Sequence, residues 1–337
     1  MASDRAQTDG LPLEAQHRAV MTGAGLIDRS SLGKAVVTGR DRAAFLQGML
    51  SNDVKALQPG EGCPAAFLDA HGKVVSLLAA YALDDRILLE LPAGTTEKFL
   101  QAIDTFLISE KAYFEHADEA YAILSLQGPG AEKMLSALSG AAFAPAPYSH
   151  LETSIAGGAV RVARRSDSVM PGFHCWTAPG HAETLWKALR EAGAVVVSAQ
   201  TLEVLRIEAG IPAYGRDVDE TAILPETRLE TLVSYTKGCY IGQETVARVK
   251  YRGHVNRALS GVVLDGDLVP SPGDAITAGD KEVGRVTSAV RSLALGRPIA
   301  LGYVRREHFE PGSAVTVQVG GTAVPARVAE LPFVTPA

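Results

Sequence analysis

The hydrophobic positions of the first part of the chain alternate between the period of a β-strand and that of an α-helix. Residues 34–38 are typical of a short strand, and a helical pattern then runs from Asp41 to Leu50. Asp is favoured at the residue that precedes a helix, so Asp41 is predicted as its N-cap. Two β-rich runs, at 74–83 and 87–91, flank a short polar segment, which predicts a hairpin.

Further strand and helix patterns follow up to about residue 192. In chain order we predict a helix within 94–108 capped by Thr95 or Thr96, a strand at 120–126, a helix at 129–138 with Pro129 at its first position, a loop at 140–150, a hairpin at 154–162 around Gly157-Gly158, a strand at 173–177 and a helix at 181–192. The first and last of these helices can be aligned on a few identical residues. This alignment is compatible with two related α+β halves, although generic strand–helix patterning would produce it as well.

The pattern changes from Leu259 onward. Short β-rich runs alternate with turns of Gly, Asp and Pro, and no helical pattern remains. This is typical of a small antiparallel barrel or sandwich of about 80 residues. We therefore predict a domain boundary near Asn256, with an α+β region at 1–256 and a β-barrel at 257–337. The two halves of the α+β region could be continuous or discontinuous subdomains.

Composition places the chain among globular proteins. It has 337 residues, of which 47% are hydrophobic and 21% charged, and its formal net charge is −6. These values exclude a disordered chain, a collagen and a coiled coil, and the length suggests about two domains. The sequence pI of about 5.8 argues against a bulk nucleic-acid coat, which would carry a positive field.

The cysteines and the N-terminal residues indicate in which cellular compartment the protein is expected. Cys63, Cys175 and Cys239 are odd in number and far apart, which argues against a disulfide framework and against a compact zinc or iron–sulfur ligand set. The histidines show no ligand spacing, so we predict no metal site. The N-terminal residues lack a basic and an apolar region of a secretory signal, and the apolar run at 74–83 is too short to span a bilayer. We expect a soluble, cytoplasmic protein.

The densest chemical motif is the segment 237–244, KGCYIGQE, which we call the signature loop. Its two glycines flank a Cys-Tyr-Ile core and predict a constrained turn that leads into a helix at 243–252. Cys239 would lie just before a helix N-terminus and two residues from Lys237, and both features favour a thiolate. The alternative is a buried structural cysteine, which is common for a free thiol.

Positive charge gathers around the same segment. Between residues 237 and 257 there are five basic residues and one acidic residue, Glu244, which gives a local charge of +4. The basic residues are Lys237, Arg248, Lys250, Arg252 and Arg257. Such a cluster could receive a polyanionic ligand, such as a polyglutamate tail or phosphates. The alternative is a solvated helix face.

A second motif is the segment 205–215, LRIEAGIPAYG. Its helical part is predicted to end at Gly210, and Pro212 prevents its continuation. The carboxylate of Glu208 could accept two parallel hydrogen bonds from a ring N–H and an exocyclic amine, as a pterin or a guanine-like edge requires. The alternative is an ion pair with Arg206 or an exposed helix end. The lone G-x-G at 23–25 is too short for a dinucleotide fingerprint, and no phosphate-binding loop or hydrolase motif occurs.

These motifs resemble those of a known family. The signature loop matches the K-G-C-Y-x-G-Q-E signature of the YgfZ-type folate-binding proteins at every fixed position, and Ala247-Arg248 and Arg252-Gly253 continue the match. The segments 39–54, 126–131 and 205–212 extend the resemblance over most of the chain. These proteins are similar in fold to the T-protein of the glycine cleavage system, a tetrahydrofolate-dependent aminomethyltransferase.

The resemblance implies a fold and a cofactor. The fold would be α+β, with two ferredoxin-like halves that form a T-protein-like folate-binding region, and an antiparallel β-barrel at the C-terminus. The cofactor would be tetrahydrofolate or a derivative, and Glu208 matches the glutamate that grips the pterin in the T-protein. The implied folate-binding residues are Glu208, Arg206, Tyr214, Lys237, Tyr240, Gln243, Arg248 and Arg252. Cys239 is implied as a candidate functional thiol.

The chain departs from the T-protein pattern at one important place. T-proteins carry an acidic pair in the strand after a G-G turn, and the matching residues here are Ser76 and Leu77. Neither side chain can hold a charge or poise an amine for transfer, which argues against an active aminomethyltransferase.

The resemblance therefore implies an accessory protein that binds tetrahydrofolate and supports assembly or repair of iron–sulfur clusters. Through those clusters it would support cluster-dependent tRNA modification. Its partners would be folate and iron–sulfur proteins as clients, with no direct contact to nucleic acid or membrane. One alternative is an aminomethyltransferase-like one-carbon enzyme. Another is a scaffold that kept the fold and lost the ligand.

Overall fold

The computed structural model describes residues 10–336, and the chain divides into two compact units. The first unit is formed by Met1–Ser166, Met170–Ser198 and Glu230–Glu244, and the second by Asp167–Val169, Ala199–Leu229 and Thr245–Ala337. The expectation about a secretory signal rests on residues 1–18, of which 1–9 lie outside the described residues. Each unit is described separately below.

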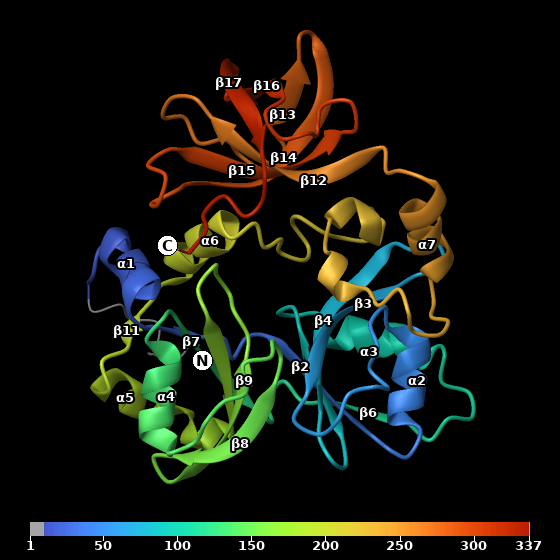
Figure 1. Cartoon of the computed structure of the whole chain (residues 1–337), viewed down its shortest axis with the longest axis vertical. Helices are drawn as coiled ribbons and strands as arrows, with labels where there is room; N and C mark the ends of the chain where they lie inside the picture. The colour runs from blue at the N-terminus through green and yellow to red at the C-terminus, as the bar shows by residue number, and fades with distance from the viewer. Residues whose placement is uncertain (1–9, 337) are drawn as a thin grey trace. The chain divides into compact units, whose positions relative to one another are not determined.

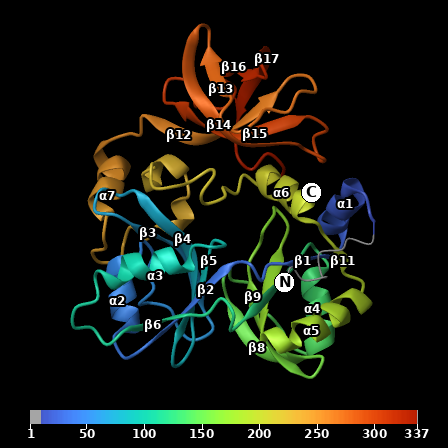
Figure 2. The ribbon, with the colours of Figure 1, turned by 180° about the vertical axis from the view of Figure 1, so that it is seen from behind.

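The first unit is built from two antiparallel-rich sheets, each covered by helices on one face (Figures 1 and 2). The five-stranded sheet has the order β3 (Gly62–Leu68), β4 (Val74–Ala82), β5 (Ile87–Leu91), β2 (Gly33–Thr38) and β6 (Tyr113–His116). The six-stranded sheet has the order β11 (Val195–Val196), β1 (Gly25–Asp28), β7 (Ala122–Gln127), β10 (Gly172–Thr177), β9 (Gly158–Arg164) and β8 (His150–Ile155). The helices of this unit are α1 (Leu13–Thr22), α2 (Arg42–Met49), α3 (Thr96–Asp104), α4 (Ala131–Ser139) and α5 (Pro179–Glu191), with a short 3₁₀ turn, η3, at Glu230–Leu232.

Alternation of side chains along the strands creates separate cores on the two faces of each sheet. Phe45, Phe99 and Leu89 belong to the core between the five-stranded sheet and helices α2 and α3. A similar core packs α4 and α5 onto the outer face of the six-stranded sheet. The inner faces of the two sheets meet through a third cluster that contains Tyr81 and Trp176. The two α+β halves predicted from the sequence are therefore present, with their sheets packed together.

Helices α2 and α3 begin where the sequence predicts, but their caps differ from the prediction. Asp41 occupies the N-cap position of α2, yet its Oδ2 accepts a hydrogen bond from the backbone N–H of Lys111 (2.8 Å) and caps no helical N–H. Thr95 precedes α3 and donates its hydroxyl hydrogen to the carbonyl of Pro92 (2.8 Å). In both cases a group outside the helix competes successfully for the side chain.

Two other local expectations need correction by a residue or two. Pro129 lies before the first residue of α4, Ala131, so it is not the first helical position. In the β8–β9 hairpin Ile155 pairs with Gly158, so Ala156 and Gly157 form the turn, with φ of 51° and 79°. Two residues with positive φ are typical of a two-residue hairpin turn, which explains why Gly157 and not Gly158 carries the turn.

The second unit contains a closed six-stranded barrel preceded by helices. Its elements are α6 (Ala199–Glu208), η2 (Leu224–Thr227), most of α7 (Gln243–Arg252), β12 (Arg257–Leu264), β13 (Ala275–Ala278), β14 (Lys281–Arg291), β15 (Pro298–Arg305), β16 (Ala314–Val319) and β17 (Thr322–Ala329). The strands, orange to red in Figure 1, close in the order β12-β15-β14-β13-β16-β17. The core that they enclose is rich in valine. The predicted antiparallel barrel is confirmed, and no α-helix follows Arg252 among the described residues.

Three further observations concern the described part of the chain. No helix within residues 10–336 is long and apolar enough to cross a membrane. All three cysteines are free. Within the same residues no group of three or more His, Cys, Asp or Glu side chains is arranged to hold a metal ion.

Candidate functional site

The signature loop is fixed to the first unit by the ammonium group of Lys237. Its Nζ donates hydrogen bonds to the backbone carbonyls of Gln47 (2.6 Å), Leu50 (2.5 Å) and Asn52 (3.0 Å). These carbonyls lie at the C-terminal end of α2 and just beyond it, where a helix leaves carbonyl groups without intrahelical partners. All three N–H groups of the ammonium are thereby used. Lys237 acts as a cap for α2 and as an anchor for the loop.

Neighbouring residues of the loop pack around this anchor. The ring of Tyr240 lies 4.9 Å from the Lys237 Nζ, in a cation–π arrangement. Gln243 Oε1 accepts a hydrogen bond from the backbone N–H of Tyr240 (3.1 Å), which closes the turn at the start of α7. Burial lowers the pKa of Lys237 to about 8 and raises that of Tyr240 to about 12. The three carbonyl partners favour the charged form of the lysine at neutral pH.

Gly242 fits the same loop against the turn between β3 and β4. Its φ is +81°, and a Cβ added there would lie 2.5 Å from the carbonyl oxygen of Asp69 and 2.9 Å from the Cβ of Leu68. Both the conformation and the close approach require glycine. The backbone N–H of Ile241 also donates to the carbonyl of Gly48 (3.1 Å). The signature loop is thus held by α2 on one side and by the β3–β4 turn on the other.

Cys239 is the exposed thiol of the three cysteines and lies between these two anchor points. Cys175 is fully buried in the six-stranded sheet, and burial raises the pKa of its thiol to about 12. Cys63 is partly exposed, and burial likewise raises its pKa to about 12 despite the nearby charge of Lys237. The alternative of a buried structural cysteine is therefore wrong for Cys239.

The residues that match the acidic pair of the T-protein, Ser76 and Leu77, are neutral, and Ser76 is buried whereas Leu77 is partly exposed. Ser76 lies in β4 opposite Phe67, is 2% exposed, and its hydroxyl donates to the carbonyl of Leu77 (3.3 Å). The carboxylate of Asp69, in the turn before β4, accepts hydrogen bonds from the backbone N–H groups of His71 (2.8 Å) and Lys73 (2.9 Å). Asp69 therefore shapes the turn between the strands.

Glu208 is the last residue of α6 in the second unit, and its carboxylate is buried and oriented. It is 1% exposed, and its Oε1 accepts hydrogen bonds from the hydroxyl of Ser292 (2.6 Å) and the backbone N–H of Ala294 (3.0 Å). Its backbone carbonyl accepts from the N–H of Phe333 (2.9 Å). Gly210 ends the helix with φ +67°, as the sequence predicts. The barrel thus fixes the carboxylate in one direction.

Arg206 belongs to a separate network in the same unit. Its guanidinium pairs with Asp217 (2.6 Å) and Glu203 and donates to the hydroxyl of Ser288 (2.7 Å). Burial alone would lower the pKa of Arg206, but the two carboxylates outweigh it and raise the pKa. The ion partners of Arg206 are therefore Glu203 and Asp217, and the network ties α6 to β14.

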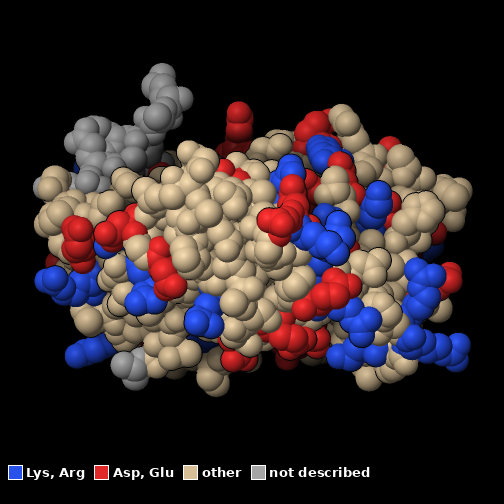
Figure 3. Space-filling view, turned by 90° about the horizontal axis from the view of Figure 1, so that it is seen from above, with Lys and Arg blue, Asp and Glu red and all other residues tan. Residues whose placement is uncertain are grey.

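The remaining predicted residues divide between the units. Lys237, Cys239, Tyr240 and Gln243 belong to the first unit, whereas Arg206, Glu208, Tyr214, Arg248 and Arg252 belong to the second. Tyr214 is half-buried and pairs with Val218 in an isolated bridge. Arg248 and Arg252 are exposed on α7. Figure 3 shows Lys and Arg interspersed with Asp and Glu on the face that it presents.

Comparison with known proteins identifies the family. Residues 8–237 match the GCVT N-terminal domain, and residues 257–335 match the glycine cleavage T-protein C-terminal barrel domain. This chain belongs to the glycine cleavage T-protein family.

Individual T-protein relatives align along nearly the whole chain. The aminomethyltransferase of Rubrobacter xylanophilus is 34% identical over 323 residues, which cover 95% of this chain and 86% of that protein. The aminomethyltransferase of Streptomyces avermitilis is 32% identical over 328 residues, with coverage of 94% and 88%. The crystal structure of the glycine cleavage system aminomethyltransferase T from Bartonella henselae superimposes with a TM-score of 0.88 at 21% identity, over 97% of this chain and 91% of that one. The T-protein fold predicted from the sequence is confirmed.

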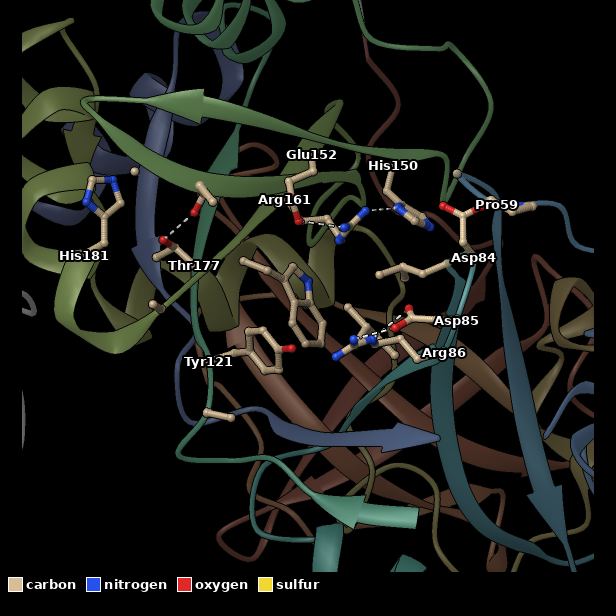
Figure 4. Close-up of a pocket in the computed structure, with 18 residues that line it drawn as sticks. Pro59, Asp84, Asp85, Arg86, Tyr121, His150, Glu152, Arg161, Thr177 and His181 are labelled. Atoms are coloured by element: carbon tan, nitrogen blue, oxygen red, sulfur yellow. Dashed lines mark hydrogen bonds and ion pairs between the residues drawn. The ribbon is translucent and has the colours of Figure 1, made fainter. Parts of the chain in front are cut away.

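The T-protein fold of this chain also contains a cavity to which no sequence motif points. It has a volume of about 710 Å³ and lies in the first unit, where the β4–β5 hairpin meets the six-stranded sheet (Figure 4). The residues 84–86 gave only a turn signal in the sequence, and their partners on β8, β9 and β10 carry no motif. The cavity depends on how the two sheets pack together, so local patterns could not indicate it.

Proposed function

We propose that this chain binds tetrahydrofolate and acts on a one-carbon unit that the folate carries. The observation that supports this most is the match to both T-protein domains, with relatives named aminomethyltransferase at more than 30% identity over about 95% of the chain. Glu208, the residue predicted to grip the pterin, is retained. Its fixed orientation by Ser292 and Ala294 suits a carboxylate that must meet a planar ring edge.

The binding half of the proposal is tested by calorimetry with 5-formyl-tetrahydrofolate. Saturable binding to the intact chain is expected, with at least a tenfold loss of affinity in Glu208→Gln, because the amide offers one acceptor oxygen where the carboxylate offers two. The control is Glu307→Gln, an exposed residue after the strand β15, which should bind as the wild type does. Circular dichroism and a melting curve would verify that the variants are folded. Absence of saturable binding by the intact folded chain would refute the proposal.

The chemical half is tested by turnover. Formation of methylene-tetrahydrofolate from an aminomethyl donor would support a one-carbon transferase, as the names of the relatives suggest. In this proposal Lys237 positions the signature loop through its three carbonyl bonds and does not bind folate itself. If the chain binds folate but forms no methylene-tetrahydrofolate, aminomethyl transfer is excluded and the second candidate function is favoured.

The second candidate is the YgfZ-type accessory role in assembly or repair of iron–sulfur clusters. Two observations favour it: the exposed thiol of Cys239 on a doubly anchored loop, and the neutral residues Ser76 and Leu77 at the positions of the acidic pair. It predicts that Cys239→Ser abolishes rescue of a cluster-enzyme defect in cells that lack the protein. The control is Cys63→Ser, which replaces a less exposed thiol on the strand β3 and should rescue the defect. Full rescue by Cys239→Ser would remove this candidate.

A further inference from the structure

The cavity in the first unit is a second candidate binding site, at a distance from the signature loop. The loop packs near the Val74 end of β4, whereas the cavity lies beyond Ala82 at the other end of the same strand. A strand of this length spans roughly 26 Å. A volume of about 710 Å³ is within the range of small-molecule pockets.

One wall of the cavity is a row of side chains across three strands of the six-stranded sheet. Glu152 on β8 pairs with Arg161 on β9, and Arg161 pairs with Trp176 on β10, so all three point to the same face. Arg161 Nη2 donates to Glu152 (2.8 Å), and its Nη1 lies 3.1 Å from the Nδ1 of His150. Figure 4 shows Arg161 reaching between Glu152 and His150.

His150 is neutral in this position. Burial, together with the neighbouring charge of Arg161, lowers its pKa to about 4. Because an arginine can only donate, Nδ1 must accept, and the ring hydrogen is on Nε2. The positive charge on this wall therefore belongs to Arg161.

The opposite wall is the turn of the β4–β5 hairpin. Arg86 forms a two-point pair with Asp85, at 2.9 and 2.6 Å, and points toward the hydroxyl of Tyr121 (Figure 4). Asp84 is exposed, and its carboxylate has no hydrogen-bond or ion-pair partner among the described residues. An uncommitted carboxylate at the mouth of a cavity can receive an ammonium group.

The inner part of the cavity is aromatic and contains a donor without a partner in the described part of the chain. The rings of Trp176 and Tyr121 lie 5.7 Å apart in an edge-to-face arrangement. Trp176 is 2% exposed, and its indole N–H has no hydrogen-bond partner among the described residues. A buried donor without an acceptor is costly, and a ligand oxygen beside Arg161 would supply the missing partner.

We propose that this cavity binds a small zwitterion of the amino-acid class with an apolar side chain. Its carboxylate lies beside Arg161 and the Trp176 N–H, its ammonium group meets Asp84, and its side chain packs against the ring of Tyr121, which is partly exposed. The charged residues of the lining include three acids and two arginines, so neither a pure anion nor a pure cation satisfies both walls. The proposal stands independently of the folate function.

The test is isothermal calorimetry of the full chain with L-phenylalanine, L-leucine and L-methionine. We expect saturable binding of at least one of them below about 10 mM. For L-phenylalanine the matched probes are 3-phenylpropanoate, which lacks the amine, and 2-phenylethylamine, which lacks the carboxylate. Each should bind at least tenfold more weakly, and the midpoint of any change in tryptophan fluorescence should shift to higher concentration by the same factor.

Two variants complete the experiment. Asp84→Asn removes an exposed carboxylate that supports no other contact of its side chain, so the protein should fold normally and lose at least tenfold in affinity. Asp280→Asn, an exposed residue in a barrel turn, is the control and should bind as the wild type does. The proposal fails if none of the three amino acids binds, if either analogue binds as tightly as L-phenylalanine, or if Asp84→Asn leaves the affinity unchanged.

Discussion

At the scale of single residues, the environment of a side chain decides what its chemical type can do. Lys237 and Arg206 were both predicted to bind the cofactor, yet each is engaged by partners from its own unit. Cys239, by contrast, is exposed as a reactive thiol must be. The residue type indicates that a side chain can bind a ligand or react. The contacts that the fold gives it decide whether the side chain is available to do so.

Ser76 provides a test of the missing acid. If the fold retains the geometry of a transferase, Ser76→Asp should raise aminomethyl transfer at least tenfold, because a positioned carboxylate typically contributes about 10²–10⁴ to such a step. The measurement is the rate of methylene-tetrahydrofolate formation, with Ser76→Asn as the uncharged control of similar size. Equal rates for both variants would show that the acid alone does not account for the departure from the T-protein pattern.

His150 predicts a pH dependence of stability. Its pKa is lowered to about 4 in the folded chain, while the ordinary value is 6.5. Between these values the unfolded chain binds more protons than the folded chain, so stability falls as the pH is lowered from 6.5 to 4. The free energy of unfolding decreases by at most about 1.4 kcal/mol for each pH unit in this range. His150→Gln should flatten this part of the profile in urea unfolding; a profile parallel to that of the wild type would contradict the assignment.

At the scale of elements, the signature loop depends on its two anchors. Its helix α7 spans Gln243–Arg252, as the sequence predicts, because the helical pattern is local. The contacts of the loop are not local: Lys237 reaches carbonyl groups 185 to 190 positions earlier in the chain. No sequence periodicity could indicate these contacts.

Two glycine substitutions in the signature loop compare a position fixed by tertiary contacts with a position that has none. Gly242→Ala should destabilise the first unit by about 2 kcal/mol, because it combines a positive φ with a clash against the carbonyl of Asp69. Gly238→Ala is a matched control in the same loop: nothing lies within 4 Å of the added carbon and its φ is not positive, so the change should stay within about 0.5 kcal/mol. Thermal unfolding and the rate of Cys239 alkylation measure both. Similar effects of the two substitutions would refute the packing argument.

At the scale of the whole molecule, ionisable side chains are buried where the two sheets of the first unit meet. Glu90 on β5 is 1% exposed and pairs with His174 on β10 (3.0 Å) and with Arg165 (3.0 Å). Lys34, fully buried on β2, lies close enough for Glu90 and Asp118 to oppose the lowering of its pKa by burial. The arrangement of the two halves is therefore specified by polar contacts as well as by the apolar cluster around Tyr81.

Removing one member of this group should be severe. Glu90→Ala removes the carboxylate that faces the buried Lys34, His174 and the partly exposed Arg165, and is expected to cost about 3–5 kcal/mol in the free energy of unfolding. Glu282→Ala, which breaks an exposed pair with Arg285 on the barrel, is the control and should cost less than about 1 kcal/mol. Urea titration followed by tryptophan fluorescence and by circular dichroism would compare them. A small effect of Glu90→Ala would mean that the apolar cluster alone holds the sheets together.

The sequence by itself determined most of the elements, the α+β halves, the C-terminal barrel and the similarity to the T-protein. It did so because strand and helix periods, turn residues and the signature loop are local patterns. Only the tertiary structure decided which backbone groups Asp41 and Lys237 contact, how Glu208 is oriented by the barrel, and that a cavity opens beside the β4–β5 hairpin. Those features arise from contacts between distant segments, and their geometry is set by packing, which a linear pattern does not encode.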